Sequence, residues 1–311
     1  MEEGKFLIEY QPLVYSQMKK NVEHERLAHA YLFEGDSGTG KYEMSTWLAK
    51  TLFCEAPENG NPCDHCINCL RIDMDEHPNV RRIAPDGQTI KVDQIRQLQA
   101  EFSKSGFETR QQVFIIQQAE KMNVSAANSL LKFLEEPAGS FLAILETDAL
   151  GRILPTIQSR CQVIHFTPLS KEKLQERLQK EGISKQTAEL LSSLTNSYDK
   201  AVEISQDEWF NGAKDIVLKW FESLQKKDPQ SFVFIQKSLL AIAKEKTQQR
   251  QIFAILLFYF QRERNREVLQ HKNVTEINRE LELILQAQQK LDANVAFQGV
   301  AEQFVLRIIH K

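Results

Sequence analysis

Four of the five cysteines of the chain lie in one short segment, with spacing typical of metal sites. They are Cys54, Cys63, Cys66 and Cys69. The two Cys-x2-Cys separations let neighbouring sulfurs converge on one tetrahedral Zn²⁺, and four thiolates leave no coordination position for water. The spacing therefore predicts a structural zinc site. His65 is a competing ligand, and buried reduced cysteines are the alternative without metal. We expect Cys161 to be a core residue of a strand.

A glycine-rich loop suggests phosphate chemistry. Residues 35–41, GDSGTGK, fit the pattern GxxxxGK, in which loop amides cradle phosphates and the lysine reaches the outer phosphate oxygens. The next residue, Tyr42, stands where an active site places a Ser or Thr hydroxyl on Mg²⁺, and a phenol oxygen projects too far to replace it. We expect weak binding of ATP or ADP, or none, and no catalytic Mg²⁺. The predicted phosphate-binding residues are Gly35, Gly38, Gly40 and Lys41.

The strand that carries the acids of a P-loop ATPase ends here in glutamines. In VFIIQQAEKM, Gln117 and Gln118 occupy the places of the metal-binding Asp and of the Glu that activates water. A neutral amide neither balances a divalent cation nor accepts a proton from water. Glu120 lies beyond the expected place, and we interpret it as a solvated charge at a helix start. The pattern predicts that the chain does not hydrolyse ATP efficiently.

These groups need a parallel sheet to position them, and the apolar pattern supplies one. Strand patterns occur at 29–35, 80–84, 113–117, 141–147 and 161–166, and helical patterns at 42–54, 91–104, 123–136 and 150–159. This alternation predicts an α/β domain with a covered parallel sheet, into which the cysteine segment is inserted. After Pro168 only helical patterns follow. We predict a P-loop-like α/β domain with a zinc module over 1–168, a small helical lid over 169–207 and an all-α bundle over 208–311.

Composition and charge bound the function. The 311 residues exceed one usual domain, and 42% hydrophobic with 26% charged residues is an ordinary globular balance. A net charge of −3 argues against a chain that binds DNA by itself. The N-terminal sequence MEEGKFLIEY lacks the pattern of a secretory signal, and the longest apolar run, 252–260, is too short to span a bilayer. We expect a cytoplasmic protein with no membrane partner.

Two further motifs resemble a known family. The segment SAANSLLKFLEEPAGSFLAILET at 125–147 and the segment IQSRC at 157–161 are similar to signature motifs of bacterial clamp-loader subunits of the AAA+ superfamily. Together with the cysteine spacing and the altered phosphate loop, they match the delta-prime family. The resemblance is specific over residues 24–168. It implies an AAA+ fold, with the helical C-terminal bundle acting as a collar that joins subunits.

The resemblance also implies a role and partners. Members of the family are stators that do not hydrolyse ATP, in a DNA polymerase III complex that places the sliding clamp on primed DNA during replication. The implied partners are ATPase subunits of the tau/gamma type and the delta subunit, with clamp and DNA reached through the complex. Arg160, in the SRC motif, is the implied arginine finger for a neighbour's ATP site. A surface salt bridge is the alternative for this residue.

Two further residues correspond to family positions, and two other functions are alternatives. Asp199 stands where active relatives carry a sensor arginine, and Thr147 corresponds to the first sensor position. An autonomous AAA+ ATPase of replication or repair is the alternative function; it would use Lys41 with an unrecognised base, and hydrolysis by the purified chain would reveal it. A DNA-binding zinc finger is disfavoured by the acids near the cysteines, which are Asp64, Asp73, Asp75 and Glu76.

Overall fold

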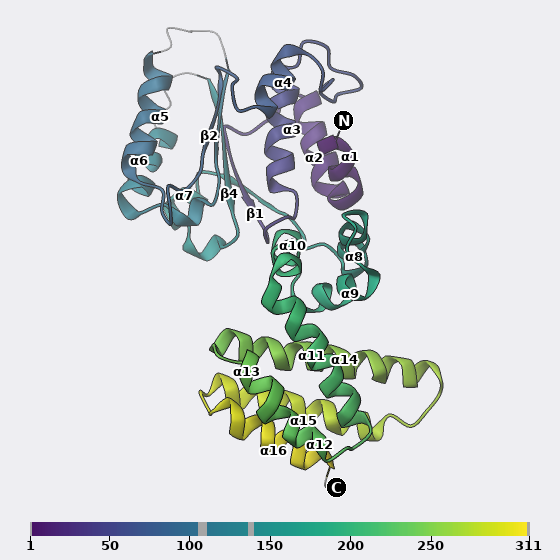
Figure 1. Cartoon of the computed structure of the whole chain (residues 1–311). Helices are drawn as coiled ribbons and strands as arrows, with labels where there is room; N and C mark the ends of the chain where they lie inside the picture. Colours follow the sequence, from purple (N-terminus) through teal and green to yellow (C-terminus); the bar gives the residue numbers. More distant parts are fainter. Residues whose placement is uncertain (1, 105–110, 136–139, 310–311) are drawn as a thin grey trace. The chain divides into compact units, whose positions relative to one another are not determined.

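The computed structural model describes residues 2–104, 111–135 and 140–309 of the chain (Figure 1). The chain divides into two compact units. One consists of Met1–Lys173 with Ser197–Asp199, and the other of Leu174–Asn196 with Lys200–Lys311. The first unit contains helices and strands, whereas the described part of the second is helical. Among the described helices, none is long and apolar enough to cross a bilayer.

The first unit is built on a five-stranded parallel sheet. The strands lie in the order β2-β3-β4-β1-β5. β1 pairs with β4 from Ala30 opposite Ala143 to Glu34 opposite Thr147. The five strands fall at the five predicted places, which confirms the parallel α/β fold. They are β1 (Ala30–Glu34), β2 (Val80–Ile83), β3 (Gln112–Ile116), β4 (Phe141–Thr147) and β5 (Gln162–His165).

Alternate residues of each central strand enter two different hydrophobic cores. In β1, Ala30 and Leu32 pack into the core on one face of the sheet, and Tyr31 and Phe33 into the core on the other. A parallel sheet covered on both faces therefore has strands that are apolar throughout. All seven residues of β4 are buried, as this arrangement requires.

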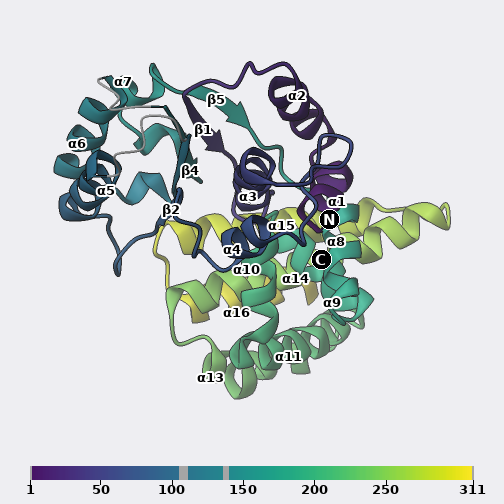
Figure 2. The same ribbon diagram turned by 90° about the horizontal axis from the view of Figure 1, so that it is seen from above.

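Helices cover both faces of the sheet (Figure 2). On one face lie α5 (Val92–Lys104), α6 (Val124–Glu135) and α7 (Pro155–Gln158). On the other lie α1 (Glu2–Tyr10), α2 (Pro12–Glu23) and α3 (Lys41–Phe53), and α4 (Ile67–Asp73) packs against α3. The helices α1 and α2 are additions to the predicted elements.

The helix predicted at 150–159 is divided in the structure. A 3-10 turn occupies Leu150–Arg152, a second such turn lies at Ala119–Lys121, and α7 begins only at Pro155. Proline has no N–H to continue the preceding turn, but it fits the first position of a helix. Pro155 therefore starts a short new helix, and this helix ends just before the SRC segment.

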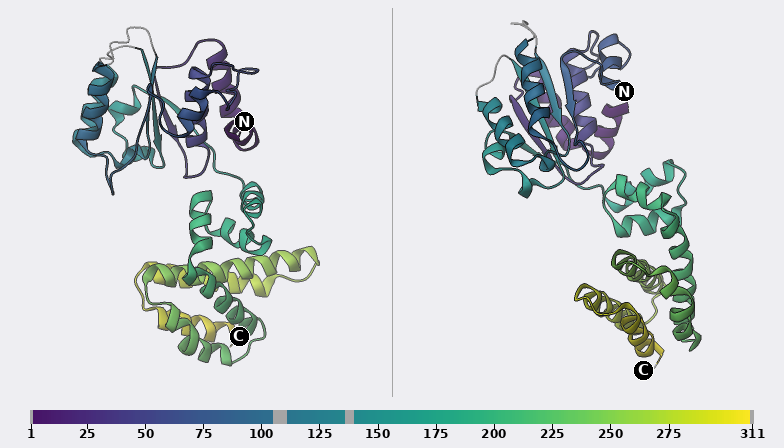
Figure 3. Two further views of the ribbon diagram at one scale, coloured as in Figure 1. Left: turned by 45° about the horizontal axis from the view of Figure 1, so that its top comes forward. Right: turned by 60° about the vertical axis from the view of Figure 1, so that its left-hand side comes forward.

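The second unit packs long helices around aromatic side chains, and Figure 3 shows it from two further sides. Trp220, Phe253 and Phe304 meet edge to face, with ring centres 5.7 to 6.0 Å apart. The all-helical C-terminal part is confirmed. From residue 171 onward the helices are α8 (Lys171–Lys180), α9 (Lys185–Leu194), α10 (Tyr198–Gln206), α11 (Glu208–Gln225), α12 (Gln230–Phe234), a π turn (Ile235–Leu239), α13 (Leu240–Ile242), α14 (Lys246–Leu269), α15 (Thr275–Asp292) and α16 (Phe297–Ile309).

Glu280 of α15 should make the stability of this unit depend on pH. Burial, with Glu276 nearby, raises the pKa of Glu280 from 4.5 to about 7. A carboxyl whose pKa is raised by folding stabilises the protein fully below its unfolded pKa, and this contribution is lost as the pH rises through its folded pKa. We expect Glu280→Gln to stabilise the protein by roughly 1 kcal/mol near pH 8 and to change nothing near pH 4. Thermal unfolding at both pH values checks this, and equal shifts would contradict it.

Candidate functional site

The glycine-rich loop joins β1 to α3 at the carboxyl edge of the sheet, where P-loop proteins bind phosphate. A Cβ on Gly35 would lie 2.5 Å from the carbonyl oxygen of Phe166. Gly40 has φ +108°, and a Cβ there would lie 2.9 Å from the ring of Phe6 on α1. The chain itself packs so closely on this loop that larger residues do not fit at these two positions.

Lys41 is fully engaged by acceptors of its own chain. The residue is 7% exposed. Its Nζ donates to the carbonyl oxygens of Gly35 at 2.5 Å and Asp36 at 2.7 Å, and to Asp148 Oδ1 at 2.9 Å. An ammonium has three N–H donors, so these contacts satisfy it. A phosphate could bind Lys41 only by displacing some of them.

A cavity of about 540 Å³ opens over the loop and is rich in acids. Asp199 accepts a hydrogen bond from Ser37 at 2.6 Å, which ties it to the loop. Burial raises the pKa of Glu146, so its carboxyl favours the neutral form. The other lining acids, Glu43, Asp148 and Asp199, outnumber the single lysine of the lining, and a polyphosphate would meet repulsion here. The lining includes Ser37, Gly38, Gly40, Lys41, Tyr42, Glu43, Gln117, Gln118, Glu146, Asp148 and Asp199.

Tyr42 has a structural contact of its own. The guanidinium carbon of Arg82, on β2, lies 4.6 Å from the centre of the Tyr42 ring, within the range of a cation–π contact. Arg82 also donates through Nη2 to Thr46 Oγ1 at 2.8 Å and pairs with Asp75 at 2.6 Å. Tyr42 therefore helps to join α3 to β2.

The interpretation of Glu120 as a solvated charge is wrong. Its carboxylate accepts a hydrogen bond from Thr147 Oγ1 at 2.8 Å, and the residue is half-buried. Thr147 ends β4 and is itself fully buried, so it holds the acid against the end of the sheet. Sequence spacing alone did not reveal this contact because the two residues belong to different strand–helix connections.

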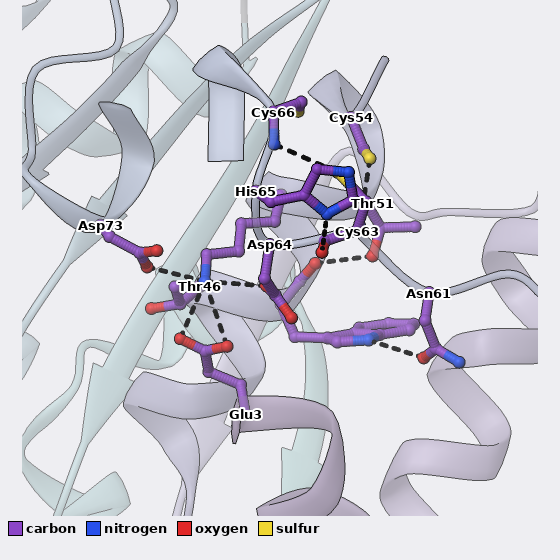
Figure 4. A network of polar contacts seen from close by, with 12 residues as sticks. Glu3, Thr46, Thr51, Cys54, Asn61, Cys63, Asp64, His65, Cys66 and Asp73 are labelled. Carbon is purple, nitrogen blue, oxygen red and sulfur yellow. Dashed lines mark hydrogen bonds and ion pairs between the residues drawn. The ribbon is translucent and has the colours of Figure 1, made fainter. Parts of the chain in front are cut away.

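The four cysteines of the predicted metal site come together in space. Their sulfurs all lie within 4.8 Å of one another. Cys54 directly follows α3, and Cys63 and Cys66 lie on the loop after it (Figure 4). Cys69 is buried in α4. A zinc ion with bonds of about 2.3 Å sets its sulfurs roughly 3.8 Å apart, so a small contraction completes the tetrahedron.

The surroundings of the sulfurs favour the thiolate at Cys66 and oppose it at Cys54 and Cys69, where burial raises the pKa. The Cys63 amide donates to the sulfur of Cys54, and the Cys66 amide donates to the sulfur of Cys63, both at 3.3 Å. Burial opposes ionisation of Cys66, but backbone hydrogen bonds and neighbouring thiols lower its pKa to about 6. Burial and the neighbouring sulfurs instead raise the pKa of Cys69. A divalent cation would let all four ionise, so the residues fit a metal ion such as zinc.

His65 is directed to the backbone. Its Nδ1 lies 2.8 Å from the carbonyl oxygen of Cys63, and among the described residues it does not belong to the group of potential ligands (Figure 4). Nearby, Asn59 and Gly60 have φ values of +51° and +74°. Two successive residues with positive φ form a tight turn, which the sequence Asn-Gly favours. This turn brings Cys63 back toward Cys54.

Arg160 lies between α7 and β5, an edge strand of the sheet. Its side chain is 35% exposed. Nη1 donates to the carbonyl oxygen of Thr156 at 2.9 Å, and Nη2 pairs with the carboxylate of Glu135, the last residue of α6. The surface salt bridge that was the alternative reading is therefore present. A guanidinium has five N–H donors, so these contacts leave capacity for another anion.

A parallel sheet whose first strand runs directly into a GxxxxGK loop and a helix places the first unit among P-loop proteins. Lys41 keeps the lysine of the motif, whereas Tyr42 stands where the motif has Ser or Thr.

Comparison with known proteins identifies the family. Residues 10–170 match a family model described as DNA polymerase III, delta subunit. The DNA polymerase III subunit delta' of Bacillus subtilis (strain 168) is 37% identical over 96% of both chains. The tau subunit of the same organism is 32% identical over 50% of this chain and 28% of its own. The chain belongs to the delta-prime family of DNA polymerase III subunits.

A solved structure also resembles the chain. It is a DNA polymerase III gamma subunit-related protein from Thermotoga maritima, 18% identical, with a TM-score of 0.42. The alignment covers 94% of this chain and 98% of that protein.

Proposed function

We propose that the chain is a non-hydrolysing stator of a cytoplasmic clamp loader that places a sliding clamp on primed DNA during replication. The observation that carries the proposal is the engagement of Lys41 by Gly35, Asp36 and Asp148. A nucleotide would have to displace these three acceptors to reach the ammonium. The family relationship supports a place in a DNA polymerase III complex.

The other catalytic positions support the same proposal. Hydrolysis needs a hydroxyl and an acid for Mg²⁺, and a group that orients the attacking water. Here Tyr42, Gln117 and Gln118 stand at those places. Glu120, the remaining acid of this segment, is bound by Thr147. We infer that the chain uses no catalytic Mg²⁺.

We expect the purified chain to bind ATP and ADP weakly or not at all and to show negligible turnover. Tyr42→Thr alone should not create activity, because the general base is still missing. Asp148→Asn should instead tighten nucleotide binding, since it removes the carboxylate that competes for Lys41. Calorimetry and phosphate release measure both properties. Turnover at ordinary ATPase rates, abolished by Lys41→Ala, would favour the alternative function of an autonomous ATPase.

We propose that Arg160 acts in trans on ATP held by a neighbouring ATPase subunit of the tau/gamma type. The sequence similarity of tau to this chain supports a related neighbour. Within this chain Glu135 provides a counter-ion for Arg160. In the complex the γ-phosphate would replace that carboxylate, because a guanidinium can bond two phosphate oxygens at once and stays ionised. The delta subunit, the clamp and primed DNA are the further partners in this proposal.

We also propose that the four cysteines bind one zinc ion with a structural role, and that the chain has three domains. The domains are 1–168, 169–207 and 208–311. The four sulfur ligands favour zinc over magnesium or calcium, which prefer oxygen. They fill a tetrahedral shell and leave no place for a reacting water. The last domain would carry the collar contacts that hold the subunits together.

A further inference from the structure

A buried lysine lies beside the cysteine cluster. Lys50 of α3 is 2% exposed, although lysine is rarely buried without a partner. Its Nζ lies 3.0 Å from Glu3 Oε1, 3.0 Å from Asp64 Oδ1 and 2.7 Å from Asp73 Oδ1 (Figure 4). Burial opposes the charge, but the hydrogen bonds of Asp73 and Glu3 outweigh it and raise the pKa of Lys50. The ammonium is therefore ionised and held by three carboxylates.

The three carboxylates come from three different segments. Glu3 belongs to α1, Asp64 lies in the cysteine loop between Cys63 and Cys66, and Asp73 ends α4. The metal ligands come from α3, the same loop and α4. The metal and the ammonium would therefore join the same parts of the chain, and only the ammonium reaches onward to α1.

The helix α1 in turn covers the phosphate loop. A Cβ on Gly40 would touch Phe6 at 2.9 Å and Leu7 at 3.6 Å, so both side chains pack against this position. Gln11, just after α1, donates to the carbonyl oxygen of Thr39 at 2.9 Å. The N-terminal segment with α1 and Gln11 is thus in direct contact with the phosphate loop.

The ion cluster depends on these segments being held together. The three carboxylates share one ammonium, so the place of each of them depends on the segments that carry the other two. A metal on the four sulfurs would fix the loop and α4, and with them Asp64 and Asp73. If the loop loosens, Lys50 loses partners in a buried place, where an unpaired charge is costly.

We infer that Lys50 is a positioning residue that couples metal binding at the four cysteines to the seating of α1 on the phosphate loop. The inference rests on the proposed metal site. Because coupling between two sites is reciprocal, weakening the Lys50 cluster also weakens metal binding. The cluster orients the loop that carries the sulfurs, as outer partners of metal sites do.

Hydrogen exchange of the full-length chain, with zinc and after removal of zinc by a chelator, tests the coupling. Zinc removal should speed exchange in residues 3–10 as well as in 54–73. If the chain takes up no zinc, the proposed metal site fails and the inference with it. If zinc protects 54–73 but leaves the exchange of 3–10 unchanged, the metal site stands and the coupling is wrong.

Three single variants sharpen the test. Asp64 has φ +61°, a conformation that Asn tolerates, so Asp64→Asn removes the charge without backbone strain. It should lower zinc affinity about tenfold in a chelator competition. Glu3→Gln should make the exchange of α1 equally fast with and without zinc. Glu58→Gln, an exposed acid of the same loop, is the matched control and should behave as the wild type. Wild-type zinc affinity in Asp64→Asn would overturn the inference.

Discussion

Arg160→Ala should lower ATP hydrolysis at the neighbouring site of a reconstituted clamp loader by about 10³- to 10⁵-fold, the range of known arginine fingers. The guanidinium adds positive charge where negative charge develops on the transferred phosphoryl group, and alanine supplies none. Clamp loading should fall with it. The measurement is ATPase and loading activity of complexes that contain wild-type or variant chain, at saturating clamp and primed DNA.

Controls separate this role from a structural one. Arg160 is an exposed ion-pair partner, so its loss should leave folding and assembly intact. Arg160→Lys should rescue poorly, because a point charge lacks the two-pronged geometry. Arg96→Ala removes an exposed arginine of α5, paired with Asp93, and should change nothing. Should Arg160→Ala complexes hydrolyse ATP and load clamps at the wild-type rate, the trans-acting role is wrong.

Removal of the metal should be the largest single loss of stability. We expect one zinc ion per chain by elemental analysis, and Cys69→Ser should abolish it. Structural zinc contributes about 10 to 16 kcal/mol of apparent binding energy in zinc-finger peptides. In a domain with its own core, we expect the cysteine segment to unfold before the sheet. Thermal unfolding and the rate of protease cleavage within residues 54–73 measure this loss of stability.

Cys161→Ser is the matched control for the zinc experiment. Cys161 is buried, like Cys69, but it packs in the core on the opposite face of the sheet from the one that α3 covers. The substitution should cost some stability and leave the zinc content unchanged. A metal-free chain that is fully folded and has four reactive thiols would refute the proposed site.

The sheet could be predicted because each of its strands is a local pattern. An apolar run such as 141–147 predicts a strand even when the strands beside it are unknown. The spacing of the cysteines is an equally local signal. Pro155 itself marks the break before α7, because proline has no N–H to continue the preceding turn. The helices α1 and α2 lie outside the predicted elements.

The chemistry of the buried lysines was beyond the sequence. Lys41 meets Asp148 and Lys50 meets Glu3 only because the fold brings distant segments together. One local signal did exist for Lys50. It follows Trp47, Leu48 and Ala49 in a helix that is buried from Met44 onward, and a charge in such a place needs a partner. The identity of that partner still required the structure.

The engagement of Lys41 also bears on how the first unit responds to the nucleotide state of its surroundings. Its phosphate loop is ordered by contacts within the chain, in the place where other P-loop proteins use a bound phosphate. A ligand shifts a conformational equilibrium only through different affinities for two states, so a nucleotide that does not bind this loop cannot change the shape of the first unit. Under the proposed function, the first unit would keep one shape through every round of ATP binding and release by its neighbours. The neighbouring subunits would then change conformation next to a unit that does not.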